Sequence, residues 1–185
     1  MKLEEIIFMS DELVPNEVPV ADKVIRLNAI NQDFFNVVKI PRITMFDCIT
    51  AQPSYTLPAD VRSKNIDLVM SGMFRFMSLE RDPVTPGQNA YRFEDKTSTL
   101  TLLPAPFSDQ QGVVRYRMIA TTSFTVSDLQ VEPDAPPEFH WTYVPALAAY
   151  IANTQDDSVK AANYENEYKA AWNVAAQNYQ GGVAR

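Results

Sequence analysis

The chain has 185 residues, of which 46% are apolar and 21% charged, with a mean hydropathy of −0.20; these values are typical of one soluble globular domain and exclude wholesale disorder. The formal net charge is −7, and positions 1–22 hold six carboxylates against Lys2 alone, so this surface repels phosphate. No apolar run approaches the roughly 20 residues of a membrane-spanning helix, so we expect no membrane contact. The single cysteine, Cys48, excludes an internal disulfide.

The segment of about residues 16–40 has the pattern of an amphipathic helix. Apolar residues recur there at three- and four-residue spacing, namely Val20, Val24, Leu27, Ile30 and Phe34. Pro41 closes the segment, because the residue before a proline is disfavoured in helical geometry. The pattern of residues 2–9 allows either a helix or an extended arm.

Between about residues 43 and 130 the pattern changes to the alternation of β-strands. The predicted strands are Ile43–Ile49, Tyr55–Leu57, Ile66–Met70, Phe74–Leu79, Ala90–Phe93, Thr99–Leu103 and Val113–Ala120. Prolines and glycines separate them at short intervals. Several short strands with closely spaced turns predict an antiparallel β-sandwich or small barrel rather than a parallel sheet.

Helical periodicity resumes over about residues 137–180, after a rigid connector with three prolines between Pro133 and Pro137. It predicts two helices, the second with a packing face of Tyr164, Tyr168, Ala171, Trp172, Ala175 and Tyr179. Residues 181–185 form a short tail after the last helix. We therefore predict an α+β fold in a single domain, residues 1–185, with one N-terminal and two C-terminal helices packed with the central sheet.

The residue types that carry catalysis do not converge in this sequence. Its five glycines, at positions 72, 87, 112, 181 and 182, are too scattered for a phosphate-binding loop. With one histidine and one cysteine, the common zinc sites are excluded. A dyad of Cys48 and His140 has no third orienting group, so we favour a buried cysteine and a capping or interface histidine. Asp156 and Asp157 suit a helix N-terminus better than a catalytic pair. We expect no enzyme, cofactor or metal site.

Four short motifs occur in a distinctive order. They are Tyr55-Thr56-Leu57-Pro58-Ala59-Asp60, Leu100-Thr101-Leu102-Leu103-Pro104-Ala105-Pro106, Pro136-Pro137-Glu138-Phe139-His140 and Tyr164-Glu165-Asn166-Glu167-Tyr168. In this order they resemble the head-to-tail connector, or neck adaptor, proteins of tailed bacteriophages, from about residue 20 to the end of the last helix. The acidic segment before residue 20 departs from the family pattern.

This resemblance implies a structural virion protein, made in the host cytoplasm and placed in the neck between capsid and tail. It implies a ring, usually of twelve copies, that binds the portal protein and the tail or stopper proteins, with double-stranded DNA passing non-specifically through the lumen. The C-terminal helix and tail would dock onto the portal, with candidate contacts Asn173, Ala176, Tyr179 and Arg185. Sheet loops would meet neighbouring copies or the tail, with candidates Gly72, Pro86, Gly87, Asp109 and Gly112.

Two other interpretations remain open at this point. One is a tail-tube or tail-terminator subunit, which would form a hexameric ring. The other is a non-viral β-sandwich module that binds a carbohydrate or peptide, with Tyr91, Phe93 and Tyr116 as its platform. Exposed aromatic side chains would support that second alternative.

Overall fold

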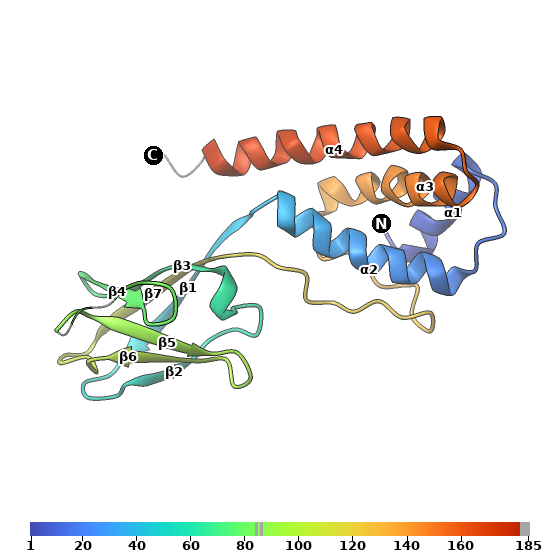
Figure 1. Ribbon diagram of the computed structural model, residues 1–185. Helices are drawn as coiled ribbons and strands as arrows, with labels where there is room; N and C mark the ends of the chain where they lie inside the picture. The colour runs from blue at the N-terminus through green and yellow to red at the C-terminus, as the bar shows by residue number, and fades with distance from the viewer. Residues whose placement is uncertain (84, 86, 182–185) are drawn as a thin grey trace. The chain divides into compact units, whose positions relative to one another are not determined.

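The computed structural model describes residues 1–83, 85 and 87–181, and it divides the chain into two compact units (Figure 1). The helical unit combines Met1–Lys39 with Ile119–Arg185, whereas the barrel unit is the continuous stretch Ile40–Met118. The helical unit is therefore built from two parts of the chain that are far apart in sequence. Whether both units act as the single domain predicted from the sequence stays a prediction.

The helical unit contains four α-helices and one 3-10 helix. Their bounds are α1 Leu3–Leu13, α2 Val20–Val37, η2 Pro137–Thr142, α3 Tyr143–Thr154 and α4 Ser158–Gly181. Helices α2 and α3 fall within the segments predicted to be helical, and α4 extends one residue beyond, to Gly181. Residues 2–9, which the sequence left undecided, belong mostly to α1. The first turn of this helix contains Glu4 and Glu5, whose charge favours a helix N-terminus, and the helix buries Leu3, Ile6, Ile7 and Ser10.

Phe34 of α2 lies at the centre of the helical core and is fully buried. Its ring contacts aromatic rings from other elements, with centroid distances of 5.5 Å to Phe139, 6.4 Å to Tyr143 and 5.5 Å to Trp172. The indole Nε1 of Trp172 also donates a hydrogen bond to Thr142 Oγ1 at 2.9 Å. The predicted aromatic face of α4 is therefore a packing face.

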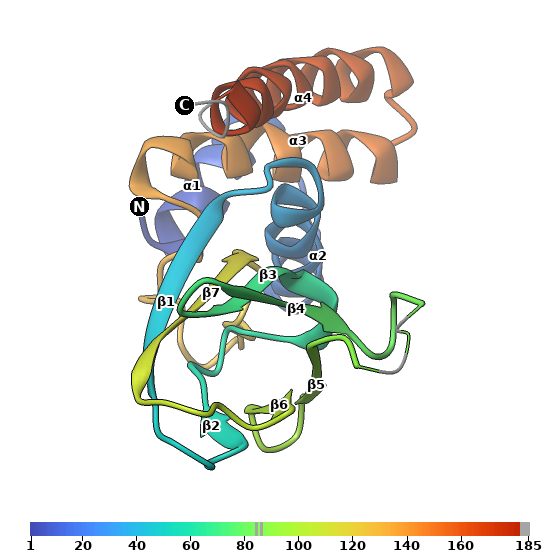
Figure 2. The same cartoon turned by 90° about the vertical axis from the view of Figure 1, so that its left-hand side faces the viewer.

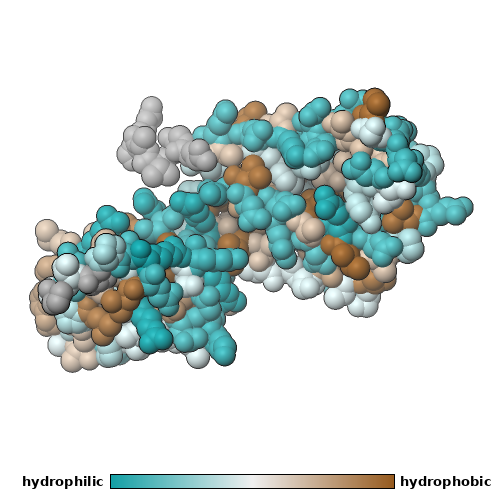
Figure 3. All heavy atoms as spheres, in the orientation of Figure 1, coloured by the Kyte–Doolittle hydropathy of each residue, from teal (hydrophilic) through white to brown (hydrophobic). Residues whose placement is uncertain are grey.

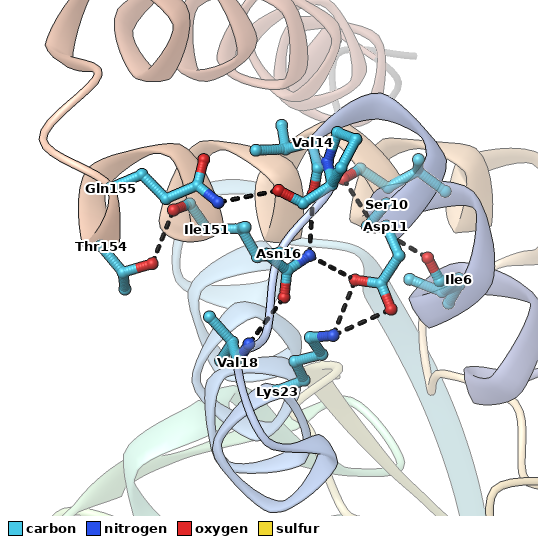
Figure 4. Close-up of polar contacts among 12 residues, drawn as sticks. Ile6, Ser10, Asp11, Val14, Asn16, Val18, Lys23, Ile151, Thr154 and Gln155 are labelled. Atoms are coloured by element: carbon cyan, nitrogen blue, oxygen red, sulfur yellow. Dashed lines mark hydrogen bonds and ion pairs between the residues drawn. The ribbon is translucent and has the colours of Figure 1, made fainter.

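An ion pair between a buried ammonium and a partly exposed carboxylate joins α1 to the start of α2 (Figure 4). The ammonium of Lys23, whose side chain is 4% exposed, lies 2.7 Å from Asp11 Oδ1 and 2.8 Å from Oδ2. Asn16, in the connection between the two helices, donates to the same carboxylate at 2.8 Å and to Val14 O at 2.7 Å. The side chain of Asn16 also accepts from Val18 N–H at 2.9 Å. These bonds satisfy polar groups that would otherwise be costly to bury.

A second polar cluster holds the chain that returns from the barrel. The Asp134 carboxylate accepts hydrogen bonds from the backbone N–H and hydroxyl groups of Thr121 and Thr122, at 2.7 to 3.2 Å, and from Asn31 Nδ2 at 2.8 Å. Partial burial would raise the pKa of Asp134, but these bonds outweigh it and lower the pKa below its ordinary value of 3.8. Asn31 in turn accepts from the buried Tyr143 hydroxyl at 2.7 Å. One carboxylate therefore links the return segment to α2 and, through Asn31, to α3.

The barrel unit is a curved seven-stranded sheet that is nearly closed (Figure 2). Its strands are β1 Pro41–Cys48, β2 Ser54–Thr56, β3 Ile66–Ser71, β4 Phe74–Ser78, β5 Ala90–Glu94, β6 Thr99–Leu103 and β7 Gln110–Arg117. The strand order is β1-β7-β3-β4-β5-β6-β2, and a 3-10 turn, Ser63–Asn65, precedes β3. The α+β class is confirmed, but the sheet is mixed, because β4 and β5 pair in parallel.

The barrel core is apolar. It comprises Cys48, Tyr55, Leu57, Val61, Ile66, Val69, Phe76, Tyr91, Phe93, Leu100, Leu102, Val114 and Tyr116, with Phe46 packed against it. The last strand ends earlier than the predicted Val113–Ala120, at Arg117, which pairs with Pro41 at the start of β1. The chain beyond it contacts α2. There Asn28 mimics a backbone amide, accepting from Phe124 N–H at 2.8 Å and donating to Phe124 O at 3.0 Å. The predicted β region of residues 43–130 therefore ends at Arg117.

Candidate functional site

The first two sequence motifs pair with each other in the barrel, where Tyr55 of β2 lies opposite Leu100 of β6, and their buried side chains stabilise the fold. The Tyr55 hydroxyl closes the turn before β2 by donating to Gln52 O at 2.6 Å, and Leu57 is buried. The Asp60 carboxylate that ends the motif accepts from the Tyr116 hydroxyl at 2.9 Å. Burial, together with this hydrogen bond and the Asp60 charge, raises the pKa of Tyr116. These residues build the barrel and present no reactive group.

The third and fourth motifs act in the same way in the helical unit. His140 is 2% exposed, and its Nε2 lies 2.7 Å from the Ala135 carbonyl, which can only accept, so Nε2 carries the proton. Of the two predicted roles of His140, capping or interface, an interface role does not fit a side chain buried within the helical unit. Tyr168 is buried, and its ring meets Trp172 edge-on at 4.8 Å. On the surface, Lys169 pairs with Glu165 one turn away, as the sequence suggested.

The candidate catalytic groups have structural roles of their own. Cys48 is buried in the barrel, where Ser71 Oγ donates to its sulfur at 3.1 Å, whereas His140 belongs to the helical unit. Asp157 accepts from Lys160 N–H at 3.0 Å and so caps α4, as predicted. Within the described ranges no cluster of three or more His, Cys, Asp or Glu side chains could hold a metal ion.

The aromatic platform of the ligand-binding alternative is not available on the barrel surface. Tyr91, Phe93 and Tyr116 are 6%, 4% and 3% exposed, because all three point into the barrel core. Among the helices of the described residues, none has the length and apolar character to cross a bilayer.

The end of α4 presents an uncharged surface. From Ala170 to Tyr179 the sequence contains no charged residue. The exposed side chains of these turns are Ala170, Asn173, Val174, Gln177 and Asn178, which we call the α4 face. Of the predicted docking residues, Asn173 is exposed and Tyr179 half-buried, whereas Ala176 packs inward and Arg185 lies outside the described residues. The interiors of protein interfaces are likewise depleted of charge.

Of the residues predicted to make loop contacts, Gly72, Gly87 and Asp109 do lie in turns or loops. Gly72 and Gly87 are exposed in turns with positive φ, of 55° and 90°, and Pro86 lies outside the described residues. The exposed Asp109 accepts from Thr50 N–H and Oγ1, both at 2.7 Å; these bonds lower the pKa of Asp109 and join two loops.

The sequence predicts that Gly112 belongs to a contact loop of the sheet. This placement is wrong, because Gly112 is buried within strand β7. A Cβ atom at this position would overlap the ring of Phe46, which faces Gly112 across the β1–β7 ladder. Gly112 therefore makes room for the ring of Phe46 inside the barrel unit.

The residues of the four motifs thus stabilise packing in both units, and the last turns of α4 leave an uncharged surface. The model of the SU10 adaptor protein family matches residues 9–185, so the chain belongs to this family. It is thus a structural adaptor protein of a bacteriophage, and the resemblance noted in the sequence is confirmed. A search among curated proteins finds no match.

Proposed function

We propose that this adaptor forms the head-to-tail connector of the virion neck: a ring, of about twelve copies by family analogy, between the portal and the tail or stopper. Family membership supports the adaptor class. The observation that carries the portal-docking role is the α4 face, whose exposed residues Ala170, Asn173, Val174, Gln177 and Asn178 are all uncharged.

The α4 face suits docking because the helix that carries it is anchored on its opposite side and because its exposed side chains are uncharged. Trp172 and Ala175, on the opposite side of the same turns, are buried and hold the helix in place. Val174 is 58% exposed and provides an apolar anchor, while the neighbouring amides can form hydrogen bonds. Removing such groups from water carries no penalty for burying charge.

The charge distribution supports a lumen through which DNA passes without binding tightly. The helical unit holds fifteen Asp and Glu residues against seven Lys and Arg. A surface with this excess of negative charge repels the phosphate backbone, so DNA would slide past it. A basic lumen would retain DNA through the release of counterions.

Affinity capture of the tagged chain from cells producing its particles tests the ring. We expect portal and tail proteins to co-purify, with about twelve copies of the chain per complex by quantitative mass spectrometry. A sixfold count with tail-tube proteins would favour the tail-terminator alternative. Recovery of the chain without any virion protein would reject the connector function.

The docking face is tested by Val174→Glu, which places a charge in the centre of the α4 face. The matched control is Val159→Glu, at the other end of α4, where the side chain is 73% exposed. We expect Val174→Glu to weaken portal capture at least tenfold and Val159→Glu to leave it unchanged, with equal melting temperatures. Equal capture by both variants would exclude docking through this face.

A further inference from the structure

The outer surface of the barrel carries an apolar patch that crosses three neighbouring strands. Ile43 and Met45 of β1 are each 62% exposed, and Val113 of β7 and Met70 of β3 continue the row opposite Met45. Leu68 of β3 stands opposite Arg115, which is in turn opposite Ile43. These side chains point away from the core because they alternate with core residues such as Val114 and Val69.

Two arginines give this patch a positive charge. Arg115 lies between Ile43 and Leu68 in the sheet, and Arg75 of β4 lies opposite Met70. Neither arginine forms an ion pair within the part of the chain that the structure describes. At the margins, Asp67 is paired with Arg117 at 3.0 Å, and Asp47 stands at the far end of β1. We define the barrel face as Ile43, Met45, Leu68, Met70, Arg75, Val113 and Arg115.

The helical unit exposes a surface with the opposite charge. On the outer side of α1, Phe8 is 63%, Met9 42% and Leu13 41% exposed, and the exposed Glu4, Glu5 and Glu12 lie among them at helical spacing. Met1, Glu4, Glu5, Phe8 and Met9 line an open hollow of about 720 Å³. We define the α1 face as Glu4, Glu5, Phe8, Met9, Glu12 and Leu13. Figure 3 shows how apolar residues reach the otherwise hydrophilic surface of both units.

We propose that the barrel face of one copy binds the α1 face of the next copy in the ring. This inference rests on the proposed function, because a closed ring of identical subunits requires two different, complementary surfaces on each subunit. The barrel face combines apolar side chains with arginines, and the α1 face combines apolar side chains with glutamates. Opposite charges around an apolar centre fix the partner and the register.

A second copy suits the barrel face through its α1 face better than through its own barrel face. A twofold contact between two barrel faces would bring the unpaired Arg75 and Arg115 of both copies together, and like charges across an interface are repulsive. The same holds for the three glutamates of two α1 faces. The head-to-tail arrangement alone satisfies both surfaces, and it repeats around a ring. Each contact can be weak by itself, since a portal template would hold many copies side by side.

Charge reversal in the full chain tests the contact. We expect Arg115→Glu and Glu12→Lys each to weaken self-association about tenfold or more in sedimentation experiments, at chain concentrations where the unchanged protein associates. Combining both changes in one chain, or mixing the two variants in equal amounts, should restore association, because each contact then regains opposite charges. The matched controls are Arg92→Glu on β5 and Glu17→Lys before α2; both residues are exposed and lie outside the two faces. Unchanged association of Arg115→Glu would overturn the inference.

Cross-linking distinguishes contacts between copies from contacts within one copy. Two chains with different tags, both with Cys48→Ser, would carry Phe8→Cys and Met45→Cys respectively. A flexible bis-maleimide should join the two tags in assembled rings, whereas a pair of Glu17→Cys and Arg92→Cys chains should stay separate. If rings of portal and adaptor are recovered but the tags never join, this contact is wrong while the connector function stands. If no ring is recovered, the connector function itself fails.

Discussion

Both units of this protein have an apolar core, but the chain builds the two units differently. The barrel unit is one continuous stretch whose strands share a ladder and an apolar core. The helical unit joins two distant stretches, and specific polar contacts such as the Asp134 cluster connect them. Charge follows the same division: the barrel unit has nine Lys and Arg against eight Asp and Glu, whereas the helical unit is strongly acidic.

This difference suggests that the helical unit depends on a few residues that no other contact replaces. Apolar packing is non-directional, so a barrel can redistribute small losses among its neighbours. Buried polar groups lack that tolerance, because each unsatisfied partner costs free energy. Both tryptophans, Trp141 and Trp172, lie in the helical unit, so their fluorescence follows that unit alone, while amide exchange of β6 and β7 follows the barrel.

We expect the largest loss of stability from the substitution Phe34→Ala. Removing a fully buried ring that contacts Phe139, Tyr143 and Trp172 should lower the free energy of unfolding of the helical unit by about 3–5 kcal/mol. Urea denaturation followed by tryptophan fluorescence measures it. Phe8→Ala, at a 63% exposed position, is the control and should change stability by less than about 1 kcal/mol. Equal loss of protection in β6 and β7 would show that the two units unfold together.

We expect the second largest loss of stability at the ion pair of Lys23 and Asp11, and the loss should differ between the two partners. Asp11→Ala leaves the ammonium of Lys23 buried without a counter-charge and should cost about 2–3 kcal/mol. Lys23→Met leaves Asp11, whose side chain is 36% exposed, in contact with water and should cost less than about 1 kcal/mol. The double variant should resemble Lys23→Met in urea denaturation. Equal costs for the two single variants would contradict this account.

In the barrel, Gly112→Ala should cost about 1–3 kcal/mol through overpacking against the Phe46 ring. The measurement is protection of β6 and β7 amides, with tryptophan fluorescence as an internal reference for the helical unit. Adding Phe46→Leu should recover part of the loss, since a smaller side chain leaves room for the new methyl group. If Phe46→Leu and Gly112→Ala are simply additive, the close approach of Gly112 to Phe46 is not the cause.

We expect the smallest effect from Asp134, whose carboxylate makes the stability of the helical unit depend on pH in the acid range. Its pKa is lower in the folded protein than its ordinary value of 3.8, so the ionised carboxylate stabilises the helical unit above pH 4. That contribution is lost as pH falls from about 4 through the lower folded pKa. Asp134→Asn should reduce stability at pH 7 by about 1–2 kcal/mol and flatten the profile in this range. Glu167→Gln, on the exposed surface of α4, should leave the profile unchanged.

The sequence by itself determined the α+β class, the positions of α2 to α4, most strands and the adaptor family. Those features follow from local periodicity and from short motifs such as Tyr55–Asp60. Both can be recognised in the sequence without knowledge of the rest of the fold. Periodicity also identified Tyr168 and Trp172 as packing residues. The capping role of Asp157 followed from the chemistry of a helix N-terminus.

Tertiary structure alone decided which distant segments meet. The parallel pairing of β4 and β5, the early end of β7 and the burial of His140, Ala176 and Gly112 depend on neighbours far along the chain. No local pattern encodes that Asp134 receives Thr121, Thr122 and Asn31, or that Gly112 accommodates Phe46. Such contacts arise only when the whole chain is packed, because each depends on the shape and hydrogen-bonding groups that the rest of the fold supplies.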